Sequence, residues 1–482
     1  MSQATATGMT VGEQIRGDEA VSNAIDTLVT TIAAKNATIT DARGPIDGKR
    51  ESYEAFMERA AAVKGRGLLY PYVGSGAGNG PLIELADGSV KWDMISGIGV
   101  HFFGHGDPGL MRASIEASTE ASLKHGNLQS NAGAYEFGEA LLREAKKNSR
   151  LAHAFITTSG AMANESAIKV CYQKHFPASR VLAFKHCFMG RSVTMCQIGD
   201  SAAGRLGIPL TTQVDYMPFW NEEAVEKVGG KQAFIDHACW RLQQYIDRYP
   251  GMHACFIFEL VQGEGGFNVS DRDYLVALMD ICKANGIAVW DDEIQSFGRT
   301  TRMFAYEYYD LGDYVDVFCV GKMTQACATL YTEEYNPKPG LLSGTFTGAG
   351  VEFAAGTQII DRLADGDYYG DDGRIARHHA EFVKHVRAMA DRHPDWFPKT
   401  PFVDDIVGGV GGMMRMTPFG GEKKPMADAC HALFDEGVIM FYCGHGPFHL
   451  RMLPPLGVMK MEDWPRVFER VEAGLARVAA TL

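Results

Sequence analysis

Residues 287–295 read Ile-Ala-Val-Trp-Asp-Asp-Glu-Ile-Gln, an apolar run that ends abruptly in three acidic side chains. A short, continuously apolar run predicts a strand that is buried on both faces. Similar runs lie at residues 152–157, 180–184, 254–260 and 315–320, and helical stretches separate them. Buried strands that alternate with helices are typical of a mostly parallel α/β sheet covered by helices on both faces. We therefore expect an α/β fold that binds its ligands at the carboxyl ends of the strands.

The segments outside this region have a different pattern. The chain has 482 residues, which is too long for a single hydrophobic core. The Asp-Gly turn within residues 81–88 predicts a β-hairpin, and glycine-rich residues 74–80 are interpreted as a flexible loop at the substrate entrance. Helices are expected at residues 20–34, 52–63, 351–364, 375–393 and 464–480, and strands at 406–416 and 448–452. We predict a large domain at residues 96–360 and a smaller α+β domain built from residues 1–95 and 361–482.

Composition and charge exclude several classes of partner. The formal net charge is -13, and no cluster of Lys and Arg offers a basic surface, so neither nucleic acid nor an anionic membrane is an expected partner. Residues 1–16 lack the apolar core of a secretory signal, and no apolar stretch is long enough to span a membrane. The ten cysteines form no C-x-x-C pair, which is typical of buried thiols in a reducing compartment. We expect a cytoplasmic protein.

Two of the loops that follow these strands suit a flat, anionic ligand. The segment Ser159-Gly160-Ala161 leads from a strand into a helix, where backbone N–H groups and the positive helix end favour a phosphate. After the next strand, Phe188 could stack on a ring, and Arg191 could bind a carboxylate. Taken singly, each feature is also compatible with an ordinary helix cap, a core aromatic residue or a surface arginine.

Acidic side chains follow two further strands. Glu259 and Glu264 flank glycines, a pattern that also occurs in simple turns. Asp291, Asp292 and Glu293 end a buried strand, where they need a cation or a protonated ring to compensate their charge. A metal-dependent hydrolase that uses these three acids is therefore an alternative, although the sequence has no H-E-x-x-H motif and no metal site is expected.

Lys322 ends the last apolar run, in the sequence Val320-Gly321-Lys322-Met323. An amine in an apolar environment has a depressed pKa and becomes a nucleophile. A phosphate cradle, a stacking aromatic ring, an aspartate and a nucleophilic lysine on successive strands are the parts that a pyridoxal-phosphate site needs. The conjunction of these features therefore indicates pyridoxal 5'-phosphate as the cofactor.

Several motifs resemble those of the class III aminotransferases. The segment Ser159-Gly-Ala-Met-Ala-Asn-Glu165 resembles S-G-S-E-A-N-E, and Phe188-Met-Gly-Arg191 resembles F-H-G-R. Glu259-Leu-Val-Gln-Gly-Glu264-Gly-Gly resembles E-P-I-Q-G-E-G-G, and residues 292–300 resemble D-E-V-Q-T-G-F-G-R-T. Ala161 and Met162 replace Ser and Glu, so the cradle would depend more on backbone N–H groups. The resemblance spans residues 70–460 and implies a fold type I pyridoxal-phosphate-dependent transferase.

The resemblance also implies a role for each residue at the cofactor. Lys322 would carry the cofactor as a Schiff base and move the proton, and Asp292 would pair with the pyridine nitrogen. Gln295 would contact the phenolic oxygen, and Phe188 would stack on the ring. The phosphate would be held by Ser159, Gly160, Ala161 and Thr345. Thr345 would reach across from a second subunit, which makes a homodimer the expected active unit.

The substrate class follows from a further part of the resemblance. Arg191 would hold the remote carboxylate of an ω-amino donor, and Arg451 would hold the α-carboxylate of glutamate or 2-oxoglutarate. Glu264 matches a carboxylate that neutralises Arg451 while the donor is bound. Ile98 replaces a tyrosine of the ornithine enzymes and disfavours ornithine, whereas lysine, 4-aminobutyrate and acetylornithine remain open. An amino-acid epimerase or aminomutase of the same fold is an alternative that would keep both Lys322 and Asp292.

Overall fold

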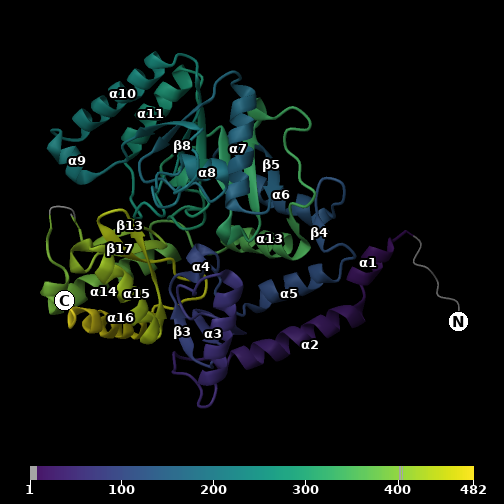
Figure 1. Ribbon diagram of the computed structural model, residues 1–482. Helices are drawn as coiled ribbons and strands as arrows, with labels where there is room; N and C mark the ends of the chain where they lie inside the picture. The colour runs from purple at the N-terminus through teal and green to yellow at the C-terminus, as the bar shows by residue number, and fades with distance from the viewer. Residues whose placement is uncertain (1–7, 401–402, 404) are drawn as a thin grey trace.

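The computed structural model describes residues 8–400, 403 and 405–482. Its centre is a seven-stranded sheet with strand order β5-β11-β10-β9-β8-β6-β7 (Figure 1). The strands are β5 (Leu151–Thr157), β6 (Arg180–Phe184), β7 (Gln213–Met217), β8 (His253–Phe258), β9 (Ala288–Asp292), β10 (Val317–Val320) and β11 (Cys327–Thr332). β11 runs antiparallel to both of its neighbours, and every other pair is parallel. The predicted mostly parallel α/β sheet is confirmed, although the sequence did not indicate β7 or β11.

Strand residues alternate between two separate cores on the two faces of the sheet. On β8, Cys255 and Ile257 pack in the smaller core together with residues of α7 (Gly160–Lys174). Phe256 and Phe258 pack in the larger core, which includes residues of α10 (Lys231–Arg248) and α11 (Arg272–Ala284). Both faces are therefore covered by helices, which explains why the strands read as continuously apolar.

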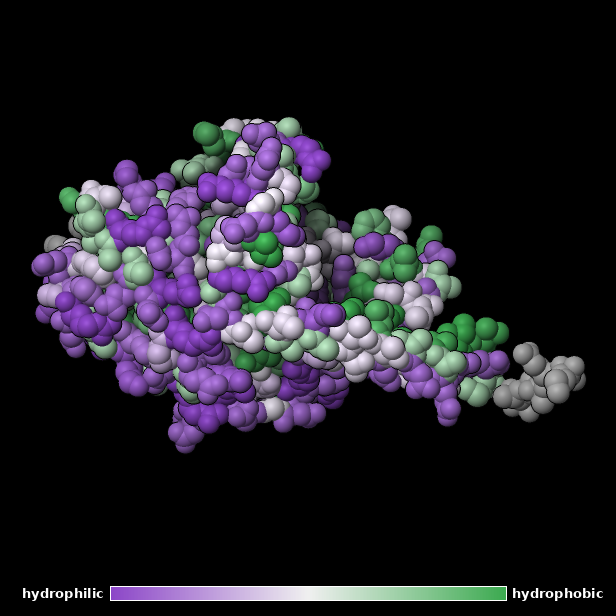
Figure 2. All heavy atoms as spheres, turned by 90° about the horizontal axis from the view of Figure 1, so that it is seen from below, coloured by the Kyte–Doolittle hydropathy of each residue, from purple (hydrophilic) through white to green (hydrophobic). Residues whose placement is uncertain are grey.

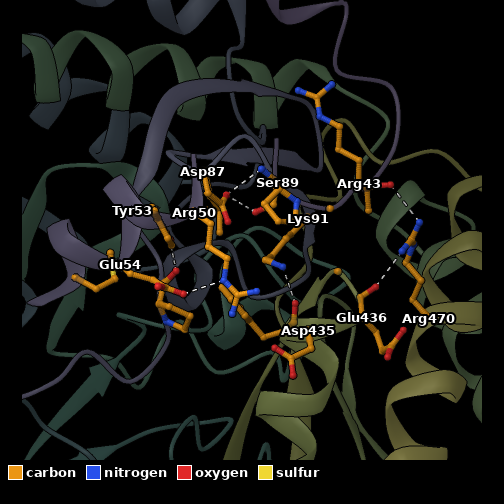
Figure 3. A pocket seen from close by; sticks show the side chains of 18 residues that line it. Arg43, Arg50, Tyr53, Glu54, Asp87, Ser89, Lys91, Asp435, Glu436 and Arg470 are labelled. Atoms are coloured by element: carbon orange, nitrogen blue, oxygen red, sulfur yellow. Dashed lines mark hydrogen bonds and ion pairs between the residues drawn. The ribbon is translucent and has the colours of Figure 1, made fainter. Parts of the chain in front are cut away.

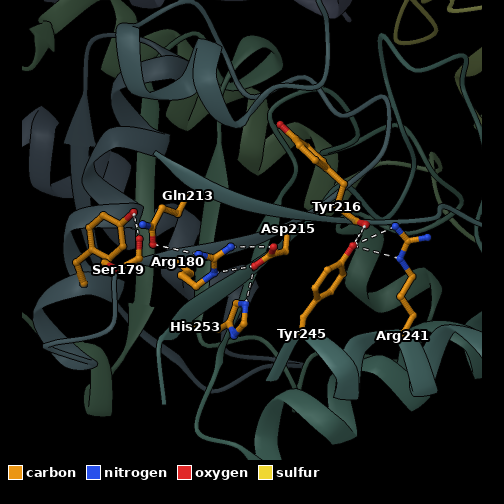
Figure 4. A network of polar contacts seen from close by, with 9 residues as sticks. Ser179, Arg180, Gln213, Asp215, Tyr216, Arg241, Tyr245 and His253 are labelled. Atoms are coloured by element: carbon orange, nitrogen blue, oxygen red, sulfur yellow. Dashed lines mark hydrogen bonds and ion pairs between the residues drawn. The ribbon is translucent and has the colours of Figure 1, made fainter. Parts of the chain in front are cut away.

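A polar network ties the outer strands together near their amino ends (Figure 4). Arg180 at the start of β6 donates two hydrogen bonds to Asp215 of β7, at 2.8 and 2.9 Å. The Nε2 atom of His253, at the start of β8, lies 2.9 Å from the same carboxylate. The bidentate geometry fixes the register of three strands at the edge of the sheet opposite to their carboxyl ends.

A second sheet joins the two ends of the chain. The strands β1 (Gly74–Asn79), β2 (Leu82–Leu85) and β3 (Val90–Asp93) form an antiparallel meander, which confirms the predicted hairpin. β15 (Val438–Ile439) then adds to β3 in parallel. The interpretation of residues 74–80 as a flexible loop is wrong, because β1 pairs with β2 and includes most of this segment.

A third, antiparallel sheet follows the order β13-β14-β17-β16. It contains β13 (Val407–Val410), β14 (Met413–Met416), β16 (Phe441–Gly444) and β17 (Phe448–Met452). The predicted strands at residues 406–416 are in fact the two arms of a hairpin. Helices α14 (Arg374–Arg392), α15 (Lys423–Asp435) and α16 (Asp463–Ala479) pack beside it (Figure 1). The division into domains at residues 95/96 and 360/361 stays a prediction.

The remaining helices flank the central sheet and extend from it. α13 (Gly350–Asp365) packs against α5 (Pro108–Ser118) and α6 (Ala132–Ala145), and α2 (Glu19–Asn36) packs on α5. α1 (Val11–Arg16) and α2 project toward the N-terminus as an arm (Figure 1). The other elements are α3 (Arg50–Lys64), α4 (Ser96–Gly99), β4 (Lys124–His125), α8 (Val193–Ile198), α9 (Glu222–Lys227), α12 (Ala305–Tyr308) and β12 (Gly348–Ala349).

Two of the compositional expectations can be compared with this structure. All ten cysteines are free thiols, and all except Cys239 are buried. Within the described part of the chain, no helix combines the length and the apolar character needed to cross a membrane. Residues 1–7, which are part of the segment 1–16 that lacks the apolar core of a secretory signal, lie outside the described residues.

Candidate active site

A cavity of about 550 Å³ opens at the carboxyl ends of the central strands. Loops after β5, β6, β8, β9 and β10 all contribute to its wall, as expected for a parallel α/β sheet. Nine residues that were assigned a role from the sequence line it: Ser159, Gly160, Ala161, Phe188, Arg191, Glu264, Asp292, Gln295 and Lys322.

Lys322 lies at the turn between β10 and β11. Its backbone is left-handed, with φ at 52°, a conformation that costs a non-glycine residue about 1–3 kcal/mol. Burial lowers the pKa of the Lys322 amine to about 8, against the opposing effect of Glu264. No hydrogen-bond partner for its Nζ atom occurs among the described residues. The geometry therefore presents an unpaired amine with a weakened hold on its proton, as nucleophilic catalysis requires.

Asp292 faces the same cavity from the end of β9 and is held by two donors. The backbone N–H of Ile294 donates to its Oδ1 atom at 3.0 Å, and the side-chain amide of Asn164 donates to Oδ2 at 2.7 Å. The same amide nitrogen donates to the carbonyl of Met189 at 2.8 Å. Burial raises the pKa of Asp292 to about 6, although both donors act to lower it. This carboxylate is oriented in advance and favours a cationic partner.

The other two acids of the triplet lie elsewhere. Strand residues alternate between faces, so Asp291 points to the opposite side from Asp292. Asp291 and Glu293 are both fully buried, and neither lines the cavity. Burial and the neighbouring Glu293 raise the pKa of Asp291 well above its usual value. Within the described ranges, no group of three or more His, Cys, Asp or Glu side chains could hold a metal ion. Of the three acids that the predicted metal-dependent hydrolase would use, only Asp292 lines the cavity.

The N-terminus of α7 forms the polar end of the cavity. Ser159 is the N-cap residue, and its hydroxyl accepts a hydrogen bond from the backbone N–H of Met162 at 3.3 Å. A side chain at Gly160 would meet the side chain of Ile294 at 2.9 Å, so a larger residue here would force Ile294 to shift. The free N–H groups and the dipole of this helix favour an anion such as a phosphate.

Phe188 and Arg191 lie together on the loop after β6. The guanidinium of Arg191 stacks 5.0 Å from the centre of the Phe188 ring. The backbone N–H of Phe188 donates to Glu259 at 3.0 Å, and the backbone N–H of Gly263 donates to the other oxygen of the same carboxylate at 3.1 Å. Glu259 thus ties together two loops of the cavity wall. Burial and the nearby Asp292 raise the pKa of Glu259 to about 8.

Arg451, on β17, approaches the cavity behind Glu264 and Gln295. Its guanidinium donates to Glu264 at 2.7 Å and to the side-chain oxygen of Gln295 at 3.4 Å. Arg451 is fully buried, and its Nε atom has no partner among the described residues. Burial acts to raise the pKa of Glu264, but Arg451, together with Lys322 and Gln295, holds that pKa below its usual value. A buried cation is thus covered by one carboxylate that also lines the cavity.

Two of the predicted site residues lie away from the cavity. Thr345 is exposed, its carbonyl lies against Gly126, and it does not line the cavity. Ile98 is half-buried in a left-handed turn, with φ at 64°, and it does not line the cavity. Val100, two residues later, does line it. One chain alone therefore does not bring either predicted side chain to the site.

The sequence analysis assigned no role to several residues that the structure brings to the site. Asn164 and Glu259 were quoted only as parts of motifs, yet each holds another site residue by hydrogen bonds. Asn164 lies one helical turn after Gly160, a spacing that places both on one face of α7. Gln325 and Cys327 also line the cavity, and no sequence pattern indicates them.

The residues of this cavity fit pyridoxal phosphate. The volume of the cavity suits a small cofactor, and Lys322 supplies an unpaired amine. The α7 N-terminus suits a phosphate, and Asp292 suits a protonated ring nitrogen. The Oδ1 atom of Asn164 is buried without a hydrogen-bond partner among the described residues, so the cavity wall keeps an unused acceptor.

Comparisons with known sequences identify relatives along most of the chain. Residues 70–473 match the family model described as aminotransferase class-III. The chain is 30% identical to the 4-aminobutyrate aminotransferase of Mycobacterium tuberculosis over 427 residues, covering 83% of this chain and 90% of that protein. It is 29% identical to the mitochondrial acetylornithine aminotransferase of Eremothecium gossypii over 382 residues, covering 76% of this chain and 82% of that protein.

Solved structures share the fold. The lysine aminotransferase of M. tuberculosis in its internal aldimine form superposes with a TM-score of 0.76 at 20% identity, covering 88% of this chain and 99% of that one. The ornithine aminotransferase of Toxoplasma gondii has a TM-score of 0.73 at 18% identity, covering 91% of this chain and 100% of that one. An amine transaminase of an uncultivated Pseudomonas species, solved with bound pyridoxal phosphate, has a TM-score of 0.71 at 20% identity, covering 83% and 94% of the two chains. The match of residues 70–473 to the family model shows that the chain belongs to the class III aminotransferases, which are pyridoxal-phosphate-dependent enzymes.

Proposed function

We propose that this enzyme transfers the terminal amino group of an ω-amino acid, such as lysine or 4-aminobutyrate, to 2-oxoglutarate. The observation that carries the proposal is the buried ion pair between Arg451 and Glu264 at the cavity wall. The names of relatives that act on 4-aminobutyrate, acetylornithine and lysine agree with this substrate class.

The ion pair answers a specific requirement of such a reaction, in which two unlike substrates use one site in turn. The acceptor, 2-oxoglutarate, carries a carboxylate beside its reacting carbon, and Arg451 is the cation that could bind it. An ω-amino donor has no carboxylate at that position and would leave Arg451 buried and unpaired. Glu264 covers the cation for the donor and moves aside for the acceptor. An epimerase or aminomutase has no second substrate and no need for this exchange.

Arg191 supplies the second carboxylate site of the proposal. Its guanidinium lines the cavity and stacks on Phe188, which fixes its direction. In this assignment Arg191 binds the remote carboxylate of the donor while the terminal amine lies at Lys322. The distance between the two groups would then select the length of the donor, at about 1–3 kcal/mol per methylene.

The cofactor supplies an electron sink for the carbon that exchanges its amino group. Lys322 moves a proton at that carbon, aided by a pKa of about 8 that lets its amine both accept and release one. Asp292, oriented by Asn164, keeps the ring nitrogen protonated. We assign the stacking contact to Phe188, the phenolic oxygen to Gln295, and the phosphate to Ser159, Gly160 and Ala161.

We further propose that the active unit is a homodimer in which Thr345 of one copy completes the phosphate site of the other. Thr345 is exposed and does not line the cavity of its own chain. Large apolar side chains are also exposed at Leu128, Tyr135 and Phe346, and Val11 and Ile15 are exposed on the N-terminal arm, where hydrophobic atoms gather (Figure 2). Apolar surface of this kind suits a protein interface.

An absorbance titration tests the substrate assignment. The purified enzyme, loaded with pyridoxal phosphate, is mixed in turn with lysine, 4-aminobutyrate, acetylornithine, ornithine and alanine. We expect the visible band to fall with one of the first three and to return when 2-oxoglutarate is added. Conversion by alanine alone, or recovery with pyruvate but not with 2-oxoglutarate, would contradict the proposal.

A further inference from the structure

A second cavity, of about 590 Å³, lies away from the active site between α3, β3 and the end of α15 (Figure 3). Its size falls within the range of small-molecule sites and slightly exceeds that of the active-site cavity. Part of its wall is apolar and comes from residues far apart in the sequence: Tyr53, Met57, Pro71, Leu85 and Phe434. The cavity thus has room and surface for the apolar body of an organic molecule.

Most charged side chains at this cavity already have a charged partner. At the rim, Arg50 pairs with Glu54 at 2.9 Å, and Arg43 pairs with Glu84 at 2.6 Å. Asp435 and Glu436 both pair with Arg477, at 3.2 and 3.0 Å. Arg470 donates to the backbone carbonyls of Glu436 and Ala42 and lies 3.9 Å from Asp41.

Lys91 is the exception. It is 7% exposed, and Figure 3 shows its side chain reaching from β3 into the cavity. Its ammonium donates to the backbone carbonyl of Phe434 at 2.7 Å and lies 4.3 Å from the centre of that residue's ring. No carboxylate among the described residues forms an ion pair with it, and Asp87, which lines the cavity, is hydrogen-bonded to Ser89. Burial lowers the pKa of Lys91, and this effect outweighs the more distant charges of Asp87 and Asp435, which act to raise it.

An ammonium has three donors, and only one of these is used here. A buried cation that has no carboxylate in direct contact is costly, and an anion that reaches it reduces that cost. The nearby apolar wall disfavours a bare inorganic ion, which would gain nothing from burying Phe434, Tyr53 and Met57. We propose that this cavity is a second small-molecule site, which binds an organic carboxylate with its carboxylate on Lys91 and its apolar body against α3 and Phe434.

A continuous segment of the chain connects this second cavity with the active-site cavity. β3 carries Lys91 and ends at Asp93, whose carboxylate accepts hydrogen bonds from the backbone N–H groups of Ile95 and Ser96. This left-handed turn continues to Val100, which lines the active-site cavity. A ligand on Lys91 therefore contacts the same strand that anchors this part of the active-site wall.

Binding can be tested on the cofactor-loaded enzyme with phenylacetate and hexanoate as probes and 2-phenylethanol as the neutral control. Isothermal titration calorimetry compares the wild type with Lys91→Met, which keeps the length of the side chain and removes its charge. We expect either acid to bind the wild type at about millimolar concentration or more tightly, and about tenfold more weakly to Lys91→Met. The neutral control should bind both proteins equally weakly.

Hydrogen exchange on the wild type tests the location without depending on the variant. Saturating phenylacetate or hexanoate should slow exchange at residues 85–91 and 434–437. The proposal would be overturned if neither acid bound the wild type at about 10 mM. It would also be overturned if the affinity for Lys91→Met were within about twofold of the wild-type value. Protection confined to the active-site loops would likewise overturn it, because that result would place the probe at Arg451 or Arg191 instead.

Discussion

The carboxylate of Glu264 lies 2.7 Å from the guanidinium of Arg451, and it is the only carboxylate in the described part of the chain that forms an ion pair with that arginine. Arg451 is fully buried, so this ion pair supplies the negative charge that compensates it. Removing the negative charge of Glu264 should therefore affect the two half-reactions differently.

We expect Glu264→Gln to lower kcat/KM for the ω-amino donor by about tenfold or more, because the donor would meet an uncovered buried cation. The kcat/KM for 2-oxoglutarate should stay level or rise, since the acceptor no longer competes with a Glu264 carboxylate for Arg451. Stopped-flow measurement of each half-reaction separates the two. Equal losses in both directions would show that Glu264 supports the fold of the site rather than acting as a cover.

The complementary change is Arg451→Ala. It removes the proposed partner of the acceptor's carboxylate, so the apparent KM for 2-oxoglutarate should rise by roughly 10²-fold, in line with about 2–5 kcal/mol for a buried charge pair. The donor half-reaction should change less. Steady-state kinetics with varied 2-oxoglutarate provide the measurement, and an unchanged KM would refute the dual-arginine assignment.

Lys322→Ala should lose turnover by at least about 10³-fold, because it removes both the covalent anchor and the group that moves the proton. The cofactor should also become removable by gel filtration, whereas the wild type keeps it. Circular dichroism checks that the variant is folded. Full turnover in this variant would invalidate the mechanism.

The buried Glu259 makes the stability of the cofactor-free protein depend on pH. Its pKa of about 8 in the folded state is above the ordinary glutamate pKa of 4.5, so between those values the folded state binds more protons than the unfolded state. Stability contributed by this group is complete below about pH 4.5 and is lost as the pH rises toward 8, at no more than about 1.4 kcal/mol per pH unit.

Glu259→Gln should flatten the fall in stability over this range, with Glu58→Gln, at an exposed carboxylate, as the matched control. Urea unfolding of the cofactor-free proteins at several pH values gives the slopes. Part of the slope should remain in the variant, because burial also raises the pKa of Glu293 to about 8. Parallel curves for the wild type and Glu259→Gln would be evidence against a neutral Glu259.

A mixing experiment tests the homodimer and the role of Thr345. Lys322→Ala chains and Thr345→Ala chains are each expected to have low activity alone. A mixed dimer should regain one intact site, because its Lys322 and its Thr345 come from different chains. Activity after subunit exchange, compared with unexchanged mixtures, measures this recovery. No gain on exchange would place Thr345 outside the site of the second copy.

Much of the fold and most of the cavity wall follow from local sequence. Continuous apolar runs predict the five strands because helices cover both faces, and ligand groups cluster because parallel strands end at one edge. β11 was missed because its residues read as an ordinary polar and apolar mixture, and its antiparallel pairing with β5 depends on residues more than 160 positions earlier.

Contacts of this kind also explain the residues whose roles were not predicted. The amide of Asn164 meets Asp292 across 128 positions of the sequence, and Glu259 meets the backbone of Phe188 across 71. Nothing local marks such contacts. The three acids at residues 291–293 show that neighbours in sequence can also lie apart in space. They look like one cluster in the sequence, but side chains alternate between the faces of β9, which separates Asp292 from Asp291.

The turn that carries Lys322 joins two fully buried antiparallel strands, β10 and β11. Its backbone therefore cannot shift without breaking hydrogen bonds on both arms of a hairpin at the centre of the sheet. Any movement of the Lys322 amine must therefore come from rotation about its own side-chain bonds. The backbone of Lys322 is thus fixed while its side chain can rotate. The substrates must be brought to it by the movement of other groups, above all Glu264.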